Sequence, residues 1–137
     1  MASDTAFNGI RAYLEANWST TPLIFENEEW PSDNPQHFVL VEVVGNFYDQ
    51  ASIGAEPVSG NLWREGGQVF LSVMTKRGTG SGTARTYAKQ LVDLFRGNEE
   101  AGVRPRGMSI GAGEPGENDG NYFRMTAVID WERDDNG

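Results

Sequence analysis

The sequence predicts an α+β domain with two helices packed on a mostly antiparallel or mixed sheet and a projecting β-hairpin arm. Two segments repeat apolar residues at helical spacing, whereas several others have the alternation or the β-branched content of strands. These segments follow the order helix, strands, helix, strands, which is typical of the α+β class. No internal repeat or linker divides the 137 residues, so we expect one domain spanning residues 1–137.

The first helix is predicted to begin at Ser3 or Asp4, because either side chain can accept the free backbone N–H groups of the first turn. Gly9 weakens this helix by about 1 kcal/mol relative to Ala, and Pro22 requires it to have ended. The apolar residues of the helix recur at steps of three and four and form one stripe. They are Phe7, Ile10, Leu14 and Trp18.

The first part of the sheet is predicted from two segments. A short strand covers Leu23–Glu26. The β-branched run Phe38–Val44 is apolar at nearly every position, as expected of a strand that is covered on both faces. Gly45-Asn46 offers a bulge or bend. Beyond it, alternation returns over Phe47–Ile53 and extends the strand pattern.

Another extended region is predicted over Leu62–Lys76, with its most strand-like part at Val69–Met74. Gly66-Gly67 interrupts the pattern, since glycine weakens the interior of a strand. We therefore expect Trp63 and Arg64 to lie on the projecting hairpin arm, outside the core sheet.

The second helix is predicted to begin after Ser81 or Thr83, either of which can cap it. Gly97 is suited to the left-handed conformation in which many helices end. The apolar residues between these positions lie on one face at helical spacing. They are Ala84, Tyr87, Ala88, Leu91 and Phe95.

The C-terminal part predicts a weak strand at Val103–Ala112, a flexible loop at Gly113–Asn121 and a final strand at Tyr122–Glu132. The final strand alternates strictly, so we expect it to have one buried face and one hydrated face. Beyond Glu132 the chain is expected to run out as a polar tail. The residues on the predicted buried face are Phe123, Met125, Ala127, Ile129 and Trp131.

Composition limits the classes of function. The net charge of −9 disfavours binding to nucleic acid phosphates, which requires clustered basic residues, but it permits an acidic surface that DNA passes without adhering. The chain has no cysteine, which excludes disulfides and fits a reducing cytoplasm. No apolar stretch is long enough to span a bilayer, and Met1–Asp4 lacks the pattern of a signal peptide. We therefore expect no membrane partner.

No catalytic, metal or cofactor site is predicted from the candidate motifs. The loop Arg77–Thr83 lacks the lysine of a phosphate-binding P-loop and the glycine spacing of a dinucleotide site. Glu117–Asn121 has part of the pattern of a calcium loop but lacks its first and last ligands. His37 is the only histidine and has no catalytic partner in the pattern. Each motif is therefore interpreted as structural or solvated.

Two alternatives from other classes remain open. Carboxylate pairs such as Glu28/Glu29 and Asp134/Asp135 can in principle serve a small hydrolase, which requires a pocket with an Asp or Glu whose pKa is raised by burial. Both pairs lie in polar segments, where we expect exposure and few pKa shifts. The other alternative is a ligand-binding module with a pocket between helix and sheet.

Trp63 has two interpretations. Trp and Arg are enriched at interface hot spots, so Trp63 beside Arg64 on an arm is suited to contact with a partner. In the other interpretation, Trp63 folds back onto its own sheet. The sequence leaves both open.

In the order of its elements, the chain resembles the phage tail terminator (tail completion) family of lambda-like siphophages over nearly its whole length. The resemblance rests on patterns in five segments rather than on a fixed signature, and small neck proteins share much of the same order. The segments are the opening helix with Ile10 and Leu14, Phe38–Val43, Gln68–Val73, the helix Ala84–Phe95 and Tyr122–Trp131.

This resemblance implies a non-enzymatic structural protein of the virion tail or neck, assembled in the host cytoplasm. Family members form a hexameric ring that caps the tail tube, stops its growth and presents the surface to which a DNA-filled head attaches. The implied partners are further copies of the chain, the tail tube protein and a head–tail connector or stopper protein. DNA passes through the lumen without specific binding. A head-completion or connector-stopper protein is the rival within virion assembly.

Contact residues are assigned by chain position, because the resemblance carries over no invariant functional residues. The arm Phe47–Gly67 and the loop Gly78–Gly82 are expected at contacts between subunits or with the tube. The loop at residues 113–120 is expected to face another ring or the lumen. The expected subunit or tube contacts are Phe47, Tyr48, Leu62, Trp63, Arg64, Arg77, Thr79 and Ser81. The expected lumen or axial-face residues are Glu114, Glu117 and Asp119.

Overall fold

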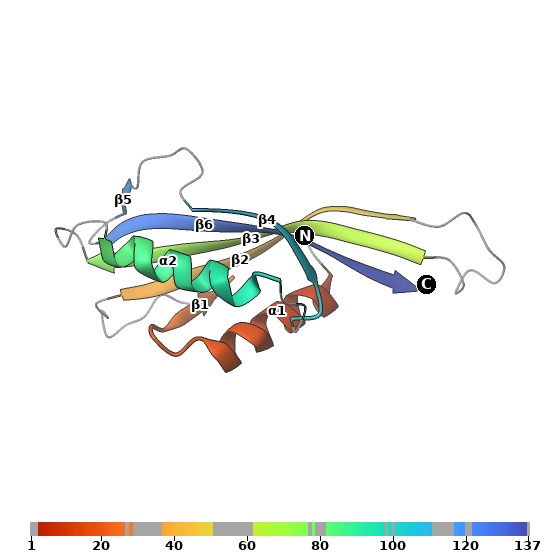
Figure 1. The fold of residues 1–137 in the computed structure, drawn as a ribbon, viewed down its shortest axis with the longest axis horizontal. Coiled ribbons are helices and arrows are strands. Elements are labelled where there is room, and N and C mark those ends of the chain that lie inside the picture. Colours follow the sequence, from red (N-terminus) through yellow and green to blue (C-terminus); the bar gives the residue numbers. More distant parts are fainter. Residues whose placement is uncertain are drawn as a thin grey trace.

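The computed structural model confirms the α+β class, with two helices on one face of a mixed sheet (Figure 1). It describes residues 3–26, 28, 37–50, 62–76, 78, 82–97, 99, 101–110, 117–119 and 122–136. The helices are α1 (Asp4–Asn17) and α2 (Gly82–Phe95). The strands are β1 (Leu23–Phe25), β2 (His37–Gln50), β3 (Leu62–Lys76), β4 (Arg104–Ile110), β5 (Glu117–Asp119) and β6 (Tyr122–Asn136).

The strands lie in the order β1-β2-β3-β6-β4, and β5 pairs with β6 outside this path. β1 runs parallel to β2, whereas the other pairs among the described strands are antiparallel. The three longest strands, β2, β3 and β6, form the centre of the sheet. The described sheet therefore ends in a short strand on each side.

The main hydrophobic core lies between the helices and the sheet. Alternate residues of the central strands point into it, which is the pattern that the sequence predicts. Along β6, the predicted buried face is confirmed from Met125 to Trp131, and Trp131 is 1% exposed. The largest fully buried side chains of this core include Ile10, Leu14, Leu71, Leu91, Phe95, Ile129 and Trp131.

The start of α1 is fixed by Ser3, whose hydroxyl oxygen accepts a hydrogen bond from the backbone N–H of Ala6 at 3.3 Å. Gly9 inside this helix has a packing reason. A Cβ at this position would lie 2.3 Å from the carbonyl oxygen of Ala101. The glycine therefore lets the helix approach the segment that precedes β4.

α2 begins at Gly82, so Thr83 lies within its first turn and is not the cap that the sequence predicts. Ser81, the other predicted cap, lies outside the described residues. The predicted end is confirmed, since Gly97 has a φ of 65°. The buried residues of the predicted stripe are Ala84, Ala88, Leu91 and Phe95.

The expectation that Phe38–Val44 is covered on both faces is wrong for most of this segment. Every second residue is buried against the helices, but Glu42 on the other face is exposed. The reason is that both described helices lie on the same face of the sheet. Phe38 is the exception, because it is 1% exposed and packs with Met74 and Tyr122 on the helix-free face.

β3 is continuous through Gly66-Gly67, so the predicted interruption is wrong. The predicted bulge is confirmed, since the register of β2 against β3 shifts between Gly45 and Phe47. A Cβ at residue 67 would lie 1.8 Å from the carbonyl oxygen of Val44, and a Cβ at residue 66 would lie 2.6 Å from the Phe47 ring. The two glycines therefore permit close contact across the bulge.

The predicted polar tail after Glu132 is also wrong, because β6 continues to Asn136 and pairs there with Leu62. The segment predicted as a flexible loop, residues 113–121, contains β5, which pairs with β6. The weak strand predicted at Val103–Ala112 is confirmed as β4. Neither of the helices in the described part of the chain is both long and apolar enough to cross a membrane.

Candidate functional site

The sheet extends beyond both helices as an arm formed by residues 47–50 of β2, 62–66 of β3 and 132–136 of β6 (Figure 1). This arm has three strands, whereas the sequence predicts a hairpin, because β6 continues alongside β3. The arm brings together many of the predicted contact residues. They are Phe47, Tyr48, Leu62, Trp63 and Arg64.

The two predicted lumen or axial-face residues that the structure describes lie far from the arm. Glu117 and Asp119 lie on β5, which pairs with Tyr122–Arg124 at the opposite end of β6. Almost the full length of β6 therefore separates β5 from the arm. The remaining predicted contact residues lie outside the described part of the chain: Arg77, Thr79, Ser81 and Glu114.

The bulge in β2 decides which side of the arm each of its residues faces. Before the bulge Val43 faces the helices, and after it Tyr48 faces that side, where it pairs with Glu65. Trp63 lies on the same side, because it is two residues from Glu65 along β3. Phe47 faces the opposite side. The arm therefore has an aromatic residue of β2 on each of its two surfaces.

These aromatic side chains are accessible. Phe47 is 42% exposed and Tyr48 is 45% exposed. The rings of Tyr48 and Trp63 meet edge to face, with centroids 6.4 Å apart. Trp63 is half-buried, and its indole N–H has no hydrogen-bond partner among the described residues. Trp63 therefore packs on its own arm and keeps part of its surface exposed, while its contact with a partner stays a prediction.

Glu65 is a buried carboxylate at the base of the arm that the sequence did not single out. It is only 2% exposed. Its oxygens accept hydrogen bonds from the backbone N–H of Ser3 at 3.1 Å and from the Ser3 hydroxyl at 2.6 Å. A guanidinium nitrogen of Arg133 on β6 lies 2.7 Å from the same carboxylate. These contacts fasten the start of α1 to the arm.

The ion pair between Arg133 and Glu65 is largely shielded from water, with side chains 12% and 3% exposed. Burial opposes the charge of Arg133, but the hydrogen bond and the negative charge of Glu65 outweigh it and raise the pKa of Arg133. The available signal in the sequence was a charged residue at an inward-facing position of β3. That signal becomes readable only when the strand is known to continue through Gly66.

A chain of polar contacts leads from the surface of the arm to α1. The hydroxyl of Tyr48 donates a hydrogen bond to Oδ2 of Asp135 at 2.7 Å, and this bond raises the pKa of Tyr48. Asp135 in turn lies 3.7 Å from Arg133. Through Arg133 and Glu65 the contacts reach the first turn of α1 at Ser3. The exposed ring of Tyr48 is therefore held in place by groups that also position α1.

On the other side of the arm, Asp134 connects β6 with both of its neighbours. Its Oδ1 lies 2.7 Å from Nε of Arg64 on β3 and 3.1 Å from a guanidinium nitrogen of Arg104 on β4. The hydrogen bonds from Arg64 and then Arg104 lower the pKa of Asp134 to about 2. The expectation of an unperturbed carboxylate is wrong here. A general acid needs a raised pKa, so this carboxylate lacks the property that the hydrolase alternative requires.

Two further candidates, His37 and Glu28, have structural contacts. His37 lies at the start of β2, and its ring meets the Tyr87 ring edge to face at 5.6 Å. Glu28 accepts a hydrogen bond from the backbone N–H of Phe25 and pairs with Arg11 at 3.0 Å, and these contacts lower its pKa, contrary to expectation. Among the described residues, no three His, Cys, Asp or Glu side chains are grouped so that they can bind a metal ion.

Comparison with known proteins places the fold but gives no function. No family model and no curated protein matches the chain. Among solved structures, 28 chains match. One of them, a protein whose name describes no activity, superposes with a TM-score of 0.63 over 96% of both chains at 16% sequence identity. At this identity the likeness establishes a shared fold alone.

Proposed function

We propose that this protein is a structural component of a phage virion, a tail terminator that caps the tail tube as a ring, expected to be a hexamer. Copies of the chain would contact one another around the ring. The tail tube protein would meet one axial face, and a connector or stopper protein the other. The observation that carries the proposal is the three-stranded arm, which presents exposed aromatic side chains beyond the helices (Figure 1).

The construction of the arm favours a binding role. Phe47 and Tyr48 are exposed but lie on a strand that is paired with its neighbour. Their backbone is therefore already ordered and would lose little conformational freedom on binding. Trp63 and Arg64 are of the residue types that dominate interface energies. The ion pair between Arg64 and Asp134 holds the guanidinium in one place. A surface arranged in this way loses little conformational entropy when a partner binds.

The charge of the chain supports the same proposal. A net charge of −9 gives an acidic surface that repels DNA phosphates, so the genome would pass through the lumen of the ring without specific binding. The protein would reside in the tail or neck of the virion after assembly in the host cytoplasm. No cofactor is needed for this role.

The length of the tail tube in particles made without this protein tests the proposal. A terminator stops polymerisation, so its loss should give tubes of uncontrolled and excessive length, seen by electron microscopy. Supplying the natural chain in trans should restore uniform tubes. Tubes of normal length that fail to join heads would instead identify a connector or stopper. Normal particles in the absence of this protein would contradict any role in tail completion.

A further inference from the structure

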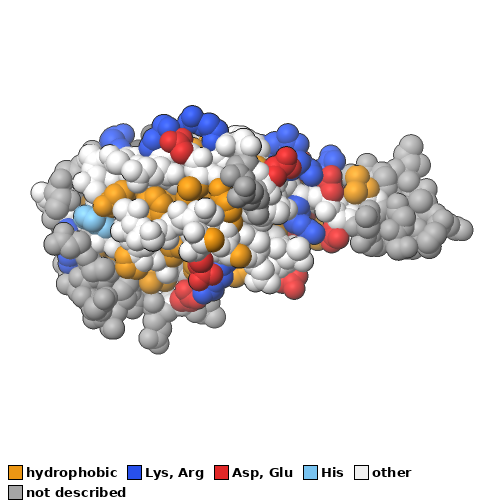
Figure 2. Space-filling model, turned by 60° about the horizontal axis from the view of Figure 1, so that its bottom comes forward, with side chains coloured by type: hydrophobic (Ala, Val, Ile, Leu, Met, Phe, Trp, Pro, Cys, Tyr) orange, Lys and Arg blue, Asp and Glu red, His pale blue; other side chains and the backbone are white. Residues whose placement is uncertain are grey.

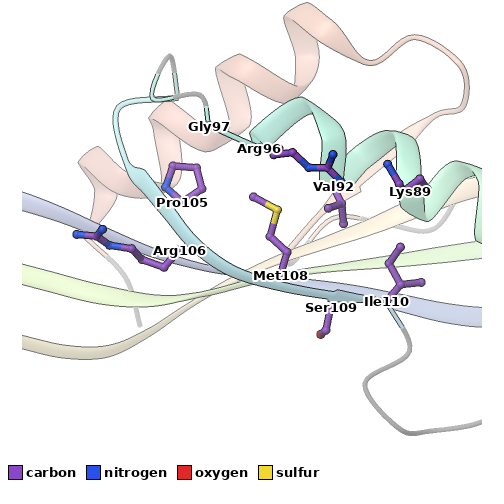
Figure 3. A pocket seen from close by; sticks show the side chains of 9 residues that line it. All are labelled: Lys89, Val92, Arg96, Gly97, Pro105, Arg106, Met108, Ser109 and Ile110. Carbon is purple, nitrogen blue, oxygen red and sulfur yellow. The ribbon is translucent and has the colours of Figure 1, made fainter.

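A groove of about 480 Å³ lies between α2 and the edge strand β4 (Figure 3). Its floor is apolar and comes from Val92 on α2 and from Met108 and Ile110 on β4. Cationic side chains also line it and remain largely exposed. They are Lys89, Arg96 and Arg106, with side chains 52%, 65% and 58% exposed.

The opposite edge of the sheet carries the opposite charge. A smaller pocket of about 250 Å³ lies at β1 and β2, with Ile24 and Leu40 among its apolar residues. Figure 2 shows basic side chains concentrated along one long side of the molecule and acidic side chains along both. The carboxylates that line the pocket are Glu26, Glu28 and Glu42.

Ion pairs within the chain reduce this contrast but do not remove it. The three cations of the groove pair with Asp93 and Glu132, and at the opposite edge Glu28 pairs with Arg11. The groove thus keeps an excess of positive charge and the β1–β2 edge an excess of negative charge. In a chain with a net charge of −9, a basic groove is the exceptional surface.

We propose that the groove binds the β1–β2 edge of a second copy of this chain in a head-to-tail contact. β1 and β4 are opposite edges of one sheet, so each copy has both halves of the contact and can use them at once. A contact between two unlike surfaces repeats from copy to copy and forms a ring when the rotation between neighbours closes. The inference rests on the proposed function for the closed ring, and deepens it by naming the surfaces that meet between neighbouring subunits.

Both edges favour contact through side chains over addition of a strand. At β1, Glu28 forms hydrogen bonds with both backbone groups of Phe25. The N–H of Phe25 donates to the Glu28 carboxylate, and its carbonyl accepts from the backbone N–H of Glu28. At β4, Pro105 has no N–H to donate, and the register shifts between Pro105 and Met108. Short capped strands, proline and bulges all discourage pairing with another strand. We therefore expect the copies to be joined by opposite charges and by the apolar residues of the groove and of the β1–β2 pocket.

This contact gives the sheet edges and the arm different binding roles. Copies joined edge to edge extend across the strands, whereas the arm extends along them (Figure 1). The edges therefore serve the lateral contact of the ring. The aromatic arm is left free for an axial partner such as the tail tube.

Two charge reversals on exposed residues test the contact, Arg96→Glu in the groove and Glu42→Lys at the opposite edge. Self-association of the purified full chain is measured by analytical ultracentrifugation at low ionic strength, where screening is weakest. Each variant alone should associate roughly tenfold more weakly than the natural chain, because it sets like charges against each other. Thermal unfolding of each variant verifies that the fold is retained.

Mixing gives the matched control. An equimolar mixture of the two variants should recover association, since each reversed surface then finds its complement on the other variant. A chain that carries both reversals should also recover association, and its net charge equals that of the natural chain. Weakened association without this recovery would overturn the head-to-tail contact, because a general effect of charge would explain it.

The lack of cysteine in the natural chain allows a second measurement. A chain carrying Arg96→Cys and Glu42→Cys should form a ladder of disulfide-linked oligomers on oxidation, whereas each single-cysteine variant should stop at dimers. A natural chain that stays monomeric, together with absence of the ladder, would overturn the inference, as would a groove that binds only a different protein. Chains that associate head to tail but do not limit tube length would count against the proposed function alone.

Discussion

In the body of the sheet, β3 and β6 turn one face towards the helices, and buried apolar residues such as Leu71 and Ile129 fill that side. In the arm, the same two strands carry charged pairs, with Arg64 opposite Asp134 and Glu65 near Arg133. The pairing of β3 with β6 continues without a shift from one region to the other. Along β3 and β6, the two regions therefore differ in their side chains and not in their backbone pairing.

The arm therefore depends on another source of stability than the body of the sheet. Beyond the helices no described element forms a second layer over the strands, so burial of apolar area contributes less there. Cross-strand side-chain pairs contribute about 0.2–1 kcal/mol each. We therefore expect the body to respond most to loss of volume, and the arm to changes of charge and pH.

The largest effect is expected in the body, from Trp131→Ala. The ring is 1% exposed, so its removal leaves a cavity and should lower the free energy of unfolding by about 3–5 kcal/mol. Denaturant-induced unfolding measures this loss. Phe47→Ala on the exposed arm is the control and should cost less than about 1 kcal/mol. Equal losses in the two variants would remove the distinction between body and arm.

At the junction of the two regions, Glu65→Ala should lower the free energy of unfolding by about 3 kcal/mol, because it leaves Arg133 with little solvent and only the more distant Asp135 as a counter-charge. The double variant Glu65→Leu/Arg133→Met replaces the pair with apolar side chains of similar volume. It should be more stable than Glu65→Ala. A double variant that is less stable than the single one would contradict the assignment of the pair.

In the arm, the contribution of Asp134 should depend on pH. Its pKa falls from an ordinary value of 3.8 to about 2 in the folded chain, so its stabilising contribution is complete above pH 3.8 and is lost as the pH falls through about 2. Asp134→Asn should therefore be less stable than the natural chain at neutral pH. Unfolding measured between about pH 5 and pH 2 should show this difference disappear. A difference that persists unchanged at pH 2 would contradict the ion pair.

The smallest effect on stability is expected from Trp63→Ala. This half-buried ring meets the Tyr48 ring edge to face, and its loss should cost about 1 kcal/mol or less. Tail completion should nevertheless fail, because the variant removes an anchor from the arm. Complementation of particles that lack the protein measures this second effect. The reverse outcome, a strongly destabilised fold with normal tails, would limit Trp63 to a structural role.

The parts of the fold that depend on local repetition could be predicted from the sequence. The alternation over Tyr122–Glu132 and the stripe over Ala84–Phe95 arise because one face of each element packs against the core. Each pattern therefore predicts both the type of element and its buried face. The bulge after Gly45 was also predictable from the residues present. The aromatic residues of the arm could be placed by their position along the chain.

The features that sequence reasoning missed depend on partners far away in the chain. Gly66-Gly67 predicts an interruption because glycine lowers the strand propensity of its own segment, which the sequence shows directly. The close approach that the glycines permit involves Val44 on another strand, which the sequence does not show. The segment after Glu132 reads as a tail because it is polar. Its partners lie on β3, and Asp134 is 70 residues from Arg64. No local pattern reports such pairings.

The single extra residue of the β2 bulge makes the length of that strand as important as its composition. Side chains alternate in direction, so the bulge at Asn46 determines that Tyr48 and not Phe47 faces Asp135. Without the bulge, Asn46 would lie opposite Gly66 and Phe47 opposite Glu65, so the two aromatic rings would exchange surfaces and the Tyr48 hydrogen bond would be lost. Deleting Asn46 removes the extra residue and the bulge together, so a chain without it would keep Phe47 opposite Gly66 and Tyr48 opposite Glu65.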